Sequence, residues 1–260
     1  MTKTIRIEND GRGVARLVLA RTEKHNALSA EMIAEVTHAA HDLGRDPTIR
    51  VIVLAADGES FCAGGDLGWM RAQMAADAAT RATEATKLAM MLKTLDECPK
   101  PIIGRVQGNA FGGGVGMMAV CDVAVGASGA KFGLTETRLG LIPATIGPYV
   151  VARMGAARAR RVFMSARLFP ASEAVDLGLL ARVVEPGDLD AAVEAEVVPY
   201  LSVAPGAVAE AKALIRRLSP PLDDGAMADT IAALVARWES PEAVEGIAAF
   251  FEKRPPSWKI

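Results

Sequence analysis

Residues that form disulfides or bind metals are scarce in this sequence, whose 260 residues include three cysteines and three histidines. Cys62, Cys98 and Cys121 stand singly in apolar surroundings, without the paired spacing of zinc sites or disulfide frameworks. Unpaired thiols are typical of a reducing compartment. We therefore expect a cytoplasmic protein that has neither a metal site nor a disulfide scaffold.

An excess of charge of one sign is also lacking, since 29 lysines and arginines face 31 aspartates and glutamates. A near-neutral chain offers no basic stripe for nucleic acid and no cationic cluster for a membrane surface. The apolar runs are short and interrupted by glycine or charge, so none approaches the ~20 residues that span a bilayer. Met1–Asp10 alternates charged and apolar residues and shows no signal-peptide core. The sequence thus predicts neither a nucleic-acid partner nor a membrane partner.

The first half of the sequence alternates strand-like and helix-like patterns. Val51–Ala55 is a continuous apolar run, which is typical of a strand buried on both faces. Further predicted strands are Ile5–Ile7, Val14–Leu19, Ile102–Val106 and Val123–Val125. Predicted helices follow Ser29, run from Ala76 to Asp96, and start near Gly113. The order of strand, crossover helix and strand favours a parallel sheet.

The sequence after Pro143 is almost entirely helical, with Pro and Gly separating the helices. The predicted helices are Ala156–Met164, Ala171–Leu177, Asp188–Leu201, Pro205–Leu218, Met227–Trp238 and Pro241–Lys253, with a candidate strand at Ala181–Val184. No fixed-period repeat or low-complexity linker separates this region from the first half. We expect it to pack on the α/β core or on a neighbouring subunit.

Glycines concentrate in two loops that follow predicted strands. Phe61–Asp66 follows the Val51–Ala55 strand, and Gly108–Gly116 follows Ile102–Val106. The carboxyl ends of parallel strands face the ligand crevice, and glycine lets a ligand approach the backbone N–H groups. Two such loops on neighbouring strands could direct two N–H groups at one carbonyl oxygen, forming an oxyanion hole that stabilises an enolate. The alternative for either loop alone is a simple tight turn.

Glu136 is the candidate acid–base residue in the segment that follows the next strand. It lies in an apolar, glycine-bounded context between Ala130 and Pro143. Burial raises a carboxyl group's affinity for protons, which suits it to proton transfer near neutral pH. The alternatives are a surface glutamate paired with Arg138 or a loop cap.

Taken together, these three segments resemble the crotonase (enoyl-CoA hydratase/isomerase) superfamily. The resemblance covers nearly the whole chain and also includes Lys24–Leu28, Cys121–Asp122 and Ala249–Arg254. It implies an α/β fold with a spiral ββα core over residues 1–195, which carries the CoA and acyl site. It also implies a helical C-terminal region over residues 196–260 that forms trimers, which can pair into hexamers. The implied partner is an acyl-CoA thioester, with CoA as part of the substrate and no permanently bound cofactor.

The resemblance implies roles for individual residues. The backbone N–H groups of Gly65 and Gly113 match the oxyanion donors, and Glu136 matches a catalytic glutamate. The residues that match CoA contacts are Lys24, Ala63, Gly64, Gly65, Asp66, Leu67, Phe250 and Lys253. In the family the C-terminal contact can come from a neighbouring subunit. Phe250 as a core residue, and Lys24 and Lys253 as solvated charges, are the alternatives.

Gly116 is the most important departure from the family pattern. Hydratases of this family place a first catalytic glutamate at the matching position, so Glu136 is here the one remaining carboxylate. A glycine at this position predicts a void beside the reacting carbons, which could hold the water or a polar group of the substrate. The stretch Ile142–Tyr149 also differs from the glycine-rich sequence that is usual in the family.

Three functions are consistent with this pattern. We expect a hydratase that adds water across the 2,3 double bond of an enoyl-CoA. The sequence around Gly116 and Thr135–Tyr149 resembles that of bacterial hydratases of the methylglutaconyl-CoA type. Such an enzyme would act on short or branched acyl chains through an enolate in the oxyanion hole. The alternatives are an enoyl-CoA isomerase that uses Glu136 as its sole acid–base group and a low-turnover acyl-CoA binding protein, against which the intact Glu136 argues.

Overall fold

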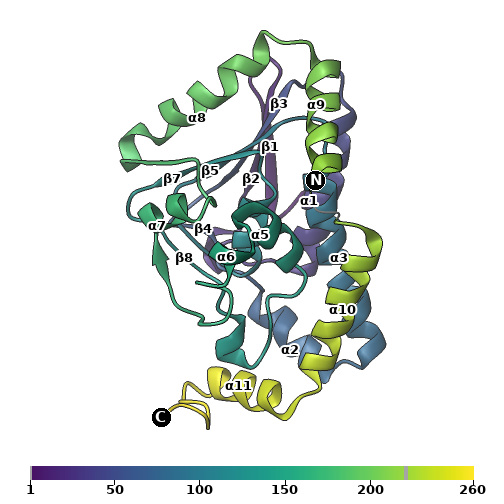
Figure 1. The fold of residues 1–260 in the computed structure, drawn as a ribbon, viewed down its shortest axis with the longest axis vertical. Coiled ribbons are helices and arrows are strands. Elements are labelled where there is room, and N and C mark those ends of the chain that lie inside the picture. The colour runs from purple at the N-terminus through teal and green to yellow at the C-terminus, as the bar shows by residue number, and fades with distance from the viewer. Residues whose placement is uncertain (1, 220–221) are drawn as a thin grey trace.

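Two β-sheets form the centre of the fold (Figure 1), as described by a computed structural model of residues 2–219 and 222–260. The larger sheet has the strand order β1-β2-β3-β5-β7-β10 and is parallel except for the β1–β2 hairpin. Its strands are β1 (Ile5–Asn9), β2 (Val14–Leu19), β3 (Val51–Ala56), β5 (Ile102–Val106), β7 (Val123–Ala127) and β10 (Arg182–Val184). The parallel α/β prediction is therefore confirmed.

The smaller sheet has the order β4-β6-β8-β9, and its short strands were not predicted. They are β4 (Ser60–Cys62), β6 (Asn109–Phe111), β8 (Lys131–Gly133) and β9 (Phe169–Pro170). β3, β5 and β7 each lead into a strand of this sheet and then into a helical segment. Those segments are α2 (Leu67–Ala75), α4 (Gly113–Ala119) and η2, a 3-10 turn (Glu136–Leu139). This repeated order is the spiral ββα arrangement.

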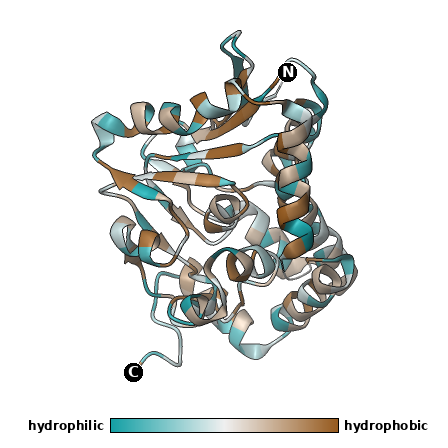
Figure 2. Cartoon of the chain, turned by 45° about the horizontal axis from the view of Figure 1, so that its top comes forward, coloured by the Kyte–Doolittle hydropathy of each residue, from teal (hydrophilic) through white to brown (hydrophobic). Residues whose placement is uncertain are grey.

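Strand β3 shows why the sheet is buried on both faces. Ile52 and Leu54 point into the main hydrophobic core, whereas Val51 and Val53 belong to a second cluster on the opposite face. Successive side chains of a strand alternate between faces, so a continuous apolar run fits a sheet that is covered on both sides. Brown, hydrophobic stretches accordingly run along the strands in the interior of the molecule (Figure 2). Helix α8 (Leu189–Val197) covers the second cluster.

The predicted N-terminal helices are present with small shifts of their ends. Helix α1 (Ala30–Arg45) begins after Ser29, whose hydroxyl accepts a hydrogen bond from the Met32 N–H group. Helix α3 (Ala78–Asp96) packs on α1 and begins after Asp77, two residues later than predicted. An aspartate or serine oxygen satisfies an N–H group that has no partner within the helix, which fixes these starting points. Helix α2 was not predicted.

The C-terminal region is helical as predicted, with one helix shorter than expected. Its helices are α5 (Gly147–Met154), α6 (Ala156–Ala159), α7 (Ala171–Asp176), α8, α9 (Pro205–Leu218), α10 (Asp224–Trp238) and α11 (Pro241–Phe251). The helix predicted to reach Met164 ends at Ala159, and the chain then turns. The residue 195 boundary falls within α8, and the division into two folding units stays a prediction. None of the helices described in residues 2–219 and 222–260 has the length and apolar character needed to cross a membrane.

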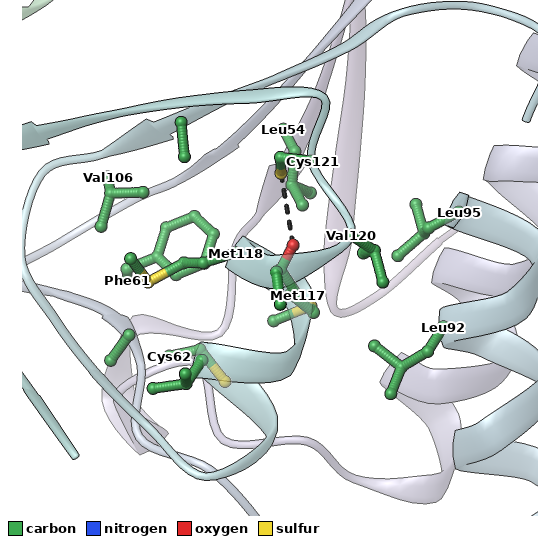
Figure 3. Packing of buried hydrophobic residues seen from close by; sticks show 14 of the residues in the cluster. Leu54, Phe61, Cys62, Leu92, Leu95, Val106, Met117, Met118, Val120 and Cys121 are labelled. Carbon is green, nitrogen blue, oxygen red and sulfur yellow. Dashed lines mark hydrogen bonds between the residues drawn. The ribbon is translucent and has the colours of Figure 1, made fainter. Parts of the chain in front are cut away.

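Helix α4 is embedded in the main core, which holds its glycine-rich start in place. Met117 and Met118 lie among side chains from β4, β5 and α3 (Figure 3). At the far end of α4 the Cys121 thiol donates a 3.2 Å hydrogen bond to the Met117 carbonyl oxygen. Because α4 is surrounded by close-packed side chains, its first turn is a rigid platform.

Candidate active site

Three neighbouring parallel strands bring the candidate site together. β4 pairs with β6, and β6 pairs with β8, both in parallel. Their carboxyl ends therefore lie side by side, and each leads directly into one of the three segments that the sequence singled out. The first contains Gly65, the second Gly113, and the third Glu136. The small sheet is thus the reason that residues 71 positions apart in the chain share one site.

The loop after β4 leaves the Gly65 N–H group unpaired. Gly64 has φ +92°, a conformation that disfavours every residue with a side chain. On either side of Gly65 the backbone is pinned by Leu28, whose N–H donates to the Gly64 carbonyl oxygen at 2.7 Å and whose carbonyl accepts from Asp66 at 3.0 Å. Within the described chain no acceptor contacts the Gly65 N–H, and Gly65 is exposed.

The Gly113 N–H group is the second unpaired donor. Gly113 is the first residue of α4, so its N–H has no partner within the helix. Gly112 before it has φ +47° and donates to the Gly133 carbonyl oxygen at 3.0 Å, which joins α4 to β8. Leu28 reaches this donor too, because a Cβ atom at position 113 would lie 2.5 Å from Leu28 Cδ1. Leu28 therefore connects the two loops.

Glu136 lies against the start of α4 in a dry environment. A Cβ atom at position 112 would lie 2.9 Å from Glu136 Oε1, so the carboxyl group faces the Gly112 backbone. The residue as a whole is only partly buried, but Oε2 is inaccessible to solvent and has no hydrogen-bond partner in the described chain. This desolvation raises the pKa of Glu136 to about 7, because a buried carboxylate loses its hydration. The group can therefore gain or lose a proton near neutral pH.

The C-terminal helices fix the turn that carries Glu136. The turn ends at Gly140, whose carbonyl oxygen accepts a 2.6 Å hydrogen bond from Arg237 Nε of α10. Arg237 also pairs with Glu242 at the start of α11. Gly246 of α11 lies so close to the turn that a Cβ atom there would approach the Leu139 carbonyl to 2.6 Å. Sequence analysis missed Arg237, which no local pattern distinguishes from other helix-surface arginines.

Some backbone N–H groups of residues 63–67, which match the CoA-binding segment, already donate hydrogen bonds within the chain. The Ala63 N–H donates to the His25 carbonyl oxygen at 3.0 Å, and the Asp66 N–H is taken by Leu28. Asp66 begins α2: its carboxylate accepts from the N–H groups of the second and third helical residues and pairs with Arg21 Nη1 at 2.7 Å. These partners lower the pKa of Asp66 despite its desolvation. Asp66 therefore holds the loop through its side chain, a role its position as a helix cap could have indicated.

The remaining predicted CoA contacts are exposed. Lys24 lies in a short 3-10 turn (Thr22–Lys24), and Leu67 is half-exposed at the start of α2. Phe250 is 48% exposed near the end of α11, and the exposed Lys253 follows that helix. The alternative of Phe250 as a core residue is therefore wrong. Helix α11, which carries Phe250, packs against the turn that holds Glu136.

The void predicted beside Gly116 is absent. Gly116 is buried in α4, and a Cβ atom there would lie 2.6 Å from Ile146 Cγ2 and 3.6 Å from Leu92 Cδ1. The expectation was wrong because the sequence shows which side chain is missing but not which neighbour fills its space. Gly116 therefore offers no room for water in this arrangement.

Other reactive groups lie outside this arrangement. Burial raises the pKa of the Cys62 thiol to about 12, so this thiol stays protonated and unreactive near neutral pH. Residues 2–219 and 222–260 contain no cluster of three or more metal-ligating side chains. A cavity of about 770 Å³ lies beneath α9, but its lining includes none of the predicted site residues.

Comparison with known proteins agrees with the fold. The enoyl-CoA hydratase/isomerase family matches residues 9–260. Mouse mitochondrial methylglutaconyl-CoA hydratase is 31% identical over 271 aligned residues, which cover 97% of this chain and 82% of that protein. An enoyl-CoA hydratase from Shewanella pealeana superposes with a TM-score of 0.82 at 38% identity, covering 99% of this chain and 96% of that one. One from Mycobacterium avium superposes with a TM-score of 0.87 at 30% identity over the whole of both chains. The chain belongs to the enoyl-CoA hydratase/isomerase family.

Proposed function

We propose that this protein is a hydratase that adds water across the 2,3 double bond of an enoyl-CoA thioester. The observation that carries the proposal is one dry carboxyl group, Glu136, beside two unpaired backbone N–H groups. Preorganised N–H donors act where negative charge develops on a carbonyl oxygen. A thioester oxygen between Gly65 and Gly113 would receive both donors and place its double bond near Glu136.

The proposed reaction uses Glu136 for both proton transfers. The ionised carboxylate takes a proton from water while the water oxygen bonds to C3. The electrons of the double bond move toward the thioester oxygen, and the resulting enolate accepts hydrogen bonds from Gly65 and Gly113. Collapse of the enolate restores the thioester as C2 takes the proton from Glu136. A carboxyl group whose pKa is about 7 can act as base and then as acid with little bias either way.

Isomerisation of a 3-enoyl-CoA is the second candidate, favoured by the close packing around Gly116. In that reaction Glu136 removes a proton from C2 and returns it to C4, so no water has to be held. Ile146 fills the space at Gly116, which leaves Glu136 as the one predicted acid–base side chain. A hydratase must bind its water with this single carboxylate and groups of the substrate.

The acyl group is proposed to be short or branched, of the methylglutaconyl type. This finer assignment is supported by the similarity to mouse and rat methylglutaconyl-CoA hydratases, each 31% identical. Because Ile146 fills the space at Gly116, a void there does not support this assignment. A substrate panel of crotonyl-, methylglutaconyl- and 3-enoyl-CoA therefore tests both the reaction and the acyl group.

The absorbance of the conjugated thioester separates the candidate reactions. Its loss from a 2-enoyl-CoA reports hydration, and its gain from a 3-enoyl-CoA reports isomerisation. We expect hydration of a short or branched 2-enoyl-CoA to be the faster reaction. Faster gain from the 3-enoyl substrate would favour the isomerase, and tight binding of all substrates without turnover would favour an acyl-CoA binding protein.

The CoA assignment can be tested without changing the acyl site. Phe250→Ala and Lys253→Ala should raise KM for acyl-CoA but not for the matching acyl-pantetheine, which lacks the nucleotide. Equal effects on both substrates would contradict a role in nucleotide binding. The proposed trimer or hexamer is tested by sedimentation equilibrium, in which a monomer would be the contrary result.

A further inference from the structure

Two glycines, Gly112 and Gly116, lie one helical turn apart at the start of α4. A Cβ atom at Gly112 would point to Glu136 Oε1 at 2.9 Å. Gly116 follows four residues later, and its N–H donates to the Gly112 carbonyl oxygen at 3.1 Å. Gly112 is the N-cap of α4, with φ +47°, so its carbonyl group joins the helix, and Gly116 lies one helical turn, about 5–6 Å, further along the axis. Whatever covers Gly116 therefore lies about one helical turn from the site of proton transfer.

Ile146 is the side chain that covers Gly116. It is only 2% exposed, and its branched Cγ2 atom lies 2.6 Å from the position of a Cβ atom on Gly116. It directly precedes α5, where its carbonyl oxygen accepts a 3.0 Å hydrogen bond from Val150. Next to it, a tight turn is closed by a 3.0 Å bond from Gly147 to Ala144. Ile146 is therefore held in place by its backbone and by the core.

We propose that Ile146 is a specificity-determining residue. By filling the space over Gly116, it keeps water away from the Glu136 carboxyl group and leaves no room for a second carboxylate at position 116. The inference deepens the proposed function and rests on it for its catalytic consequence. With Ile146 in place, the space over Gly116 has no room for a side chain at position 116 or for a water molecule. The water that is added must then approach from the substrate side.

Neighbouring charged groups do not account for the raised pKa of Glu136. Helix α4 carries no titratable residue between Gly113 and Ala119. On α10 and α11, Arg237 is engaged with Gly140 and Glu242, and the nearby Glu245 pairs with Arg254. Arg138 of the same turn is exposed. Desolvation by burial is therefore the largest cause of the raised pKa of Glu136, and the proposal assigns part of that burial to Ile146.

The first experiment removes Ile146 and measures the ionisation of Glu136. Ile146→Ala should lower the midpoint of the rate–pH profile from about 7 by about one pH unit, because water then reaches the carboxyl group. It should also raise hydration relative to isomerisation severalfold. The matched control is Ile49→Ala, an equally buried isoleucine before the opposite end of β3. The control should lower Tm but leave the pH midpoint and the product ratio unchanged.

A second pair of variants tests the contact itself and does not depend on activity. Gly116→Ser should lower Tm strongly, because its Cβ atom meets Ile146 Cγ2. Ile146→Leu removes the branch at Cβ but keeps the side-chain volume, so this variant should fold. Combined with Gly116→Ser, it should restore much of the Tm that Gly116→Ser alone loses. Interactions between touching residues appear as such non-additivity.

The outcomes separate this inference from the proposed function. If no substrate turns over, the midpoint is measured instead from the pH dependence of Tm relative to Glu136→Gln. An unchanged midpoint in Ile146→Ala would overturn the inference even if hydration is confirmed. Additive Tm changes for Gly116→Ser and Ile146→Leu would overturn it as well.

Discussion

Replacing Glu136 by glutamine should make the protein more stable at alkaline pH while it removes activity. The pKa of Glu136 is raised from 4.5 to about 7 by burial. At 1.36 kcal/mol per pKa unit, keeping this carboxylate charged in the folded state costs about 3 kcal/mol above pH 7. Glutamine has nearly the same shape and carries no charge, so it avoids this cost.

The sign of the effect follows from proton binding. Between about pH 4.5 and pH 7 the folded protein keeps the Glu136 proton that the unfolded chain has lost, so the free energy of unfolding falls as pH rises. Below this window wild type and Glu136→Gln should unfold alike. Above it the variant should gain a Tm of about 5–10 °C, since each kcal/mol shifts Tm by about 2–4 °C in a chain of this size.

Circular dichroism melts of both proteins at about pH 4 and about pH 8.5 measure this difference. Glu173→Gln is the control of opposite sign, because Arg167 and Arg161 stabilise the Glu173 carboxylate and lower its pKa. That variant should lose stability at alkaline pH. In the same preparation Glu136→Gln should reduce turnover by about 10²–10⁴-fold. A Tm difference that is the same at both pH values, or turnover within a few-fold of wild type, would refute the reasoning.

Three further substitutions and one control test how the site is held. Gly113→Ala should lower kcat by about 10²-fold or more, because its Cβ atom would displace Leu28, which positions both oxyanion donors; a kcat unchanged within error would show that Leu28 does not couple the loops. Asp66→Ala should cost about 2–3 kcal/mol in a urea melt, whereas the exposed helix cap Asp77→Ala should cost about 1 kcal/mol. Equal losses would mean that the ion pair of Asp66 contributes nothing. Arg237→Ala should lower kcat with little change in KM, and a change in KM alone would assign Arg237 to substrate binding.

The sequence by itself determined the large sheet and the place of the candidate site. A run such as Val51–Ala55, apolar at every position, is stable only as a strand covered on both faces, and the structure covers it on both faces. Gly64 and Gly112 have positive φ values that disfavour side chains, so the loops had to carry glycine where they do. These features follow from local chemistry and can be recognised without knowing what lies nearby.

The tertiary structure decided how the site is enclosed. The short strands β4, β6 and β8 have too few residues to show a period, yet their parallel pairing is what joins Gly65, Gly113 and Glu136. The burial of Glu136 and its raised pKa arise only in the folded chain, where its carboxyl group lies against Gly112, 24 residues away in the sequence. The filled space at Gly116 shows the limit most clearly, because Ile146 lies 30 residues away and reaches it only in the folded chain. A missing side chain can be read from the sequence, but the neighbour that takes its space is decided by close packing in three dimensions.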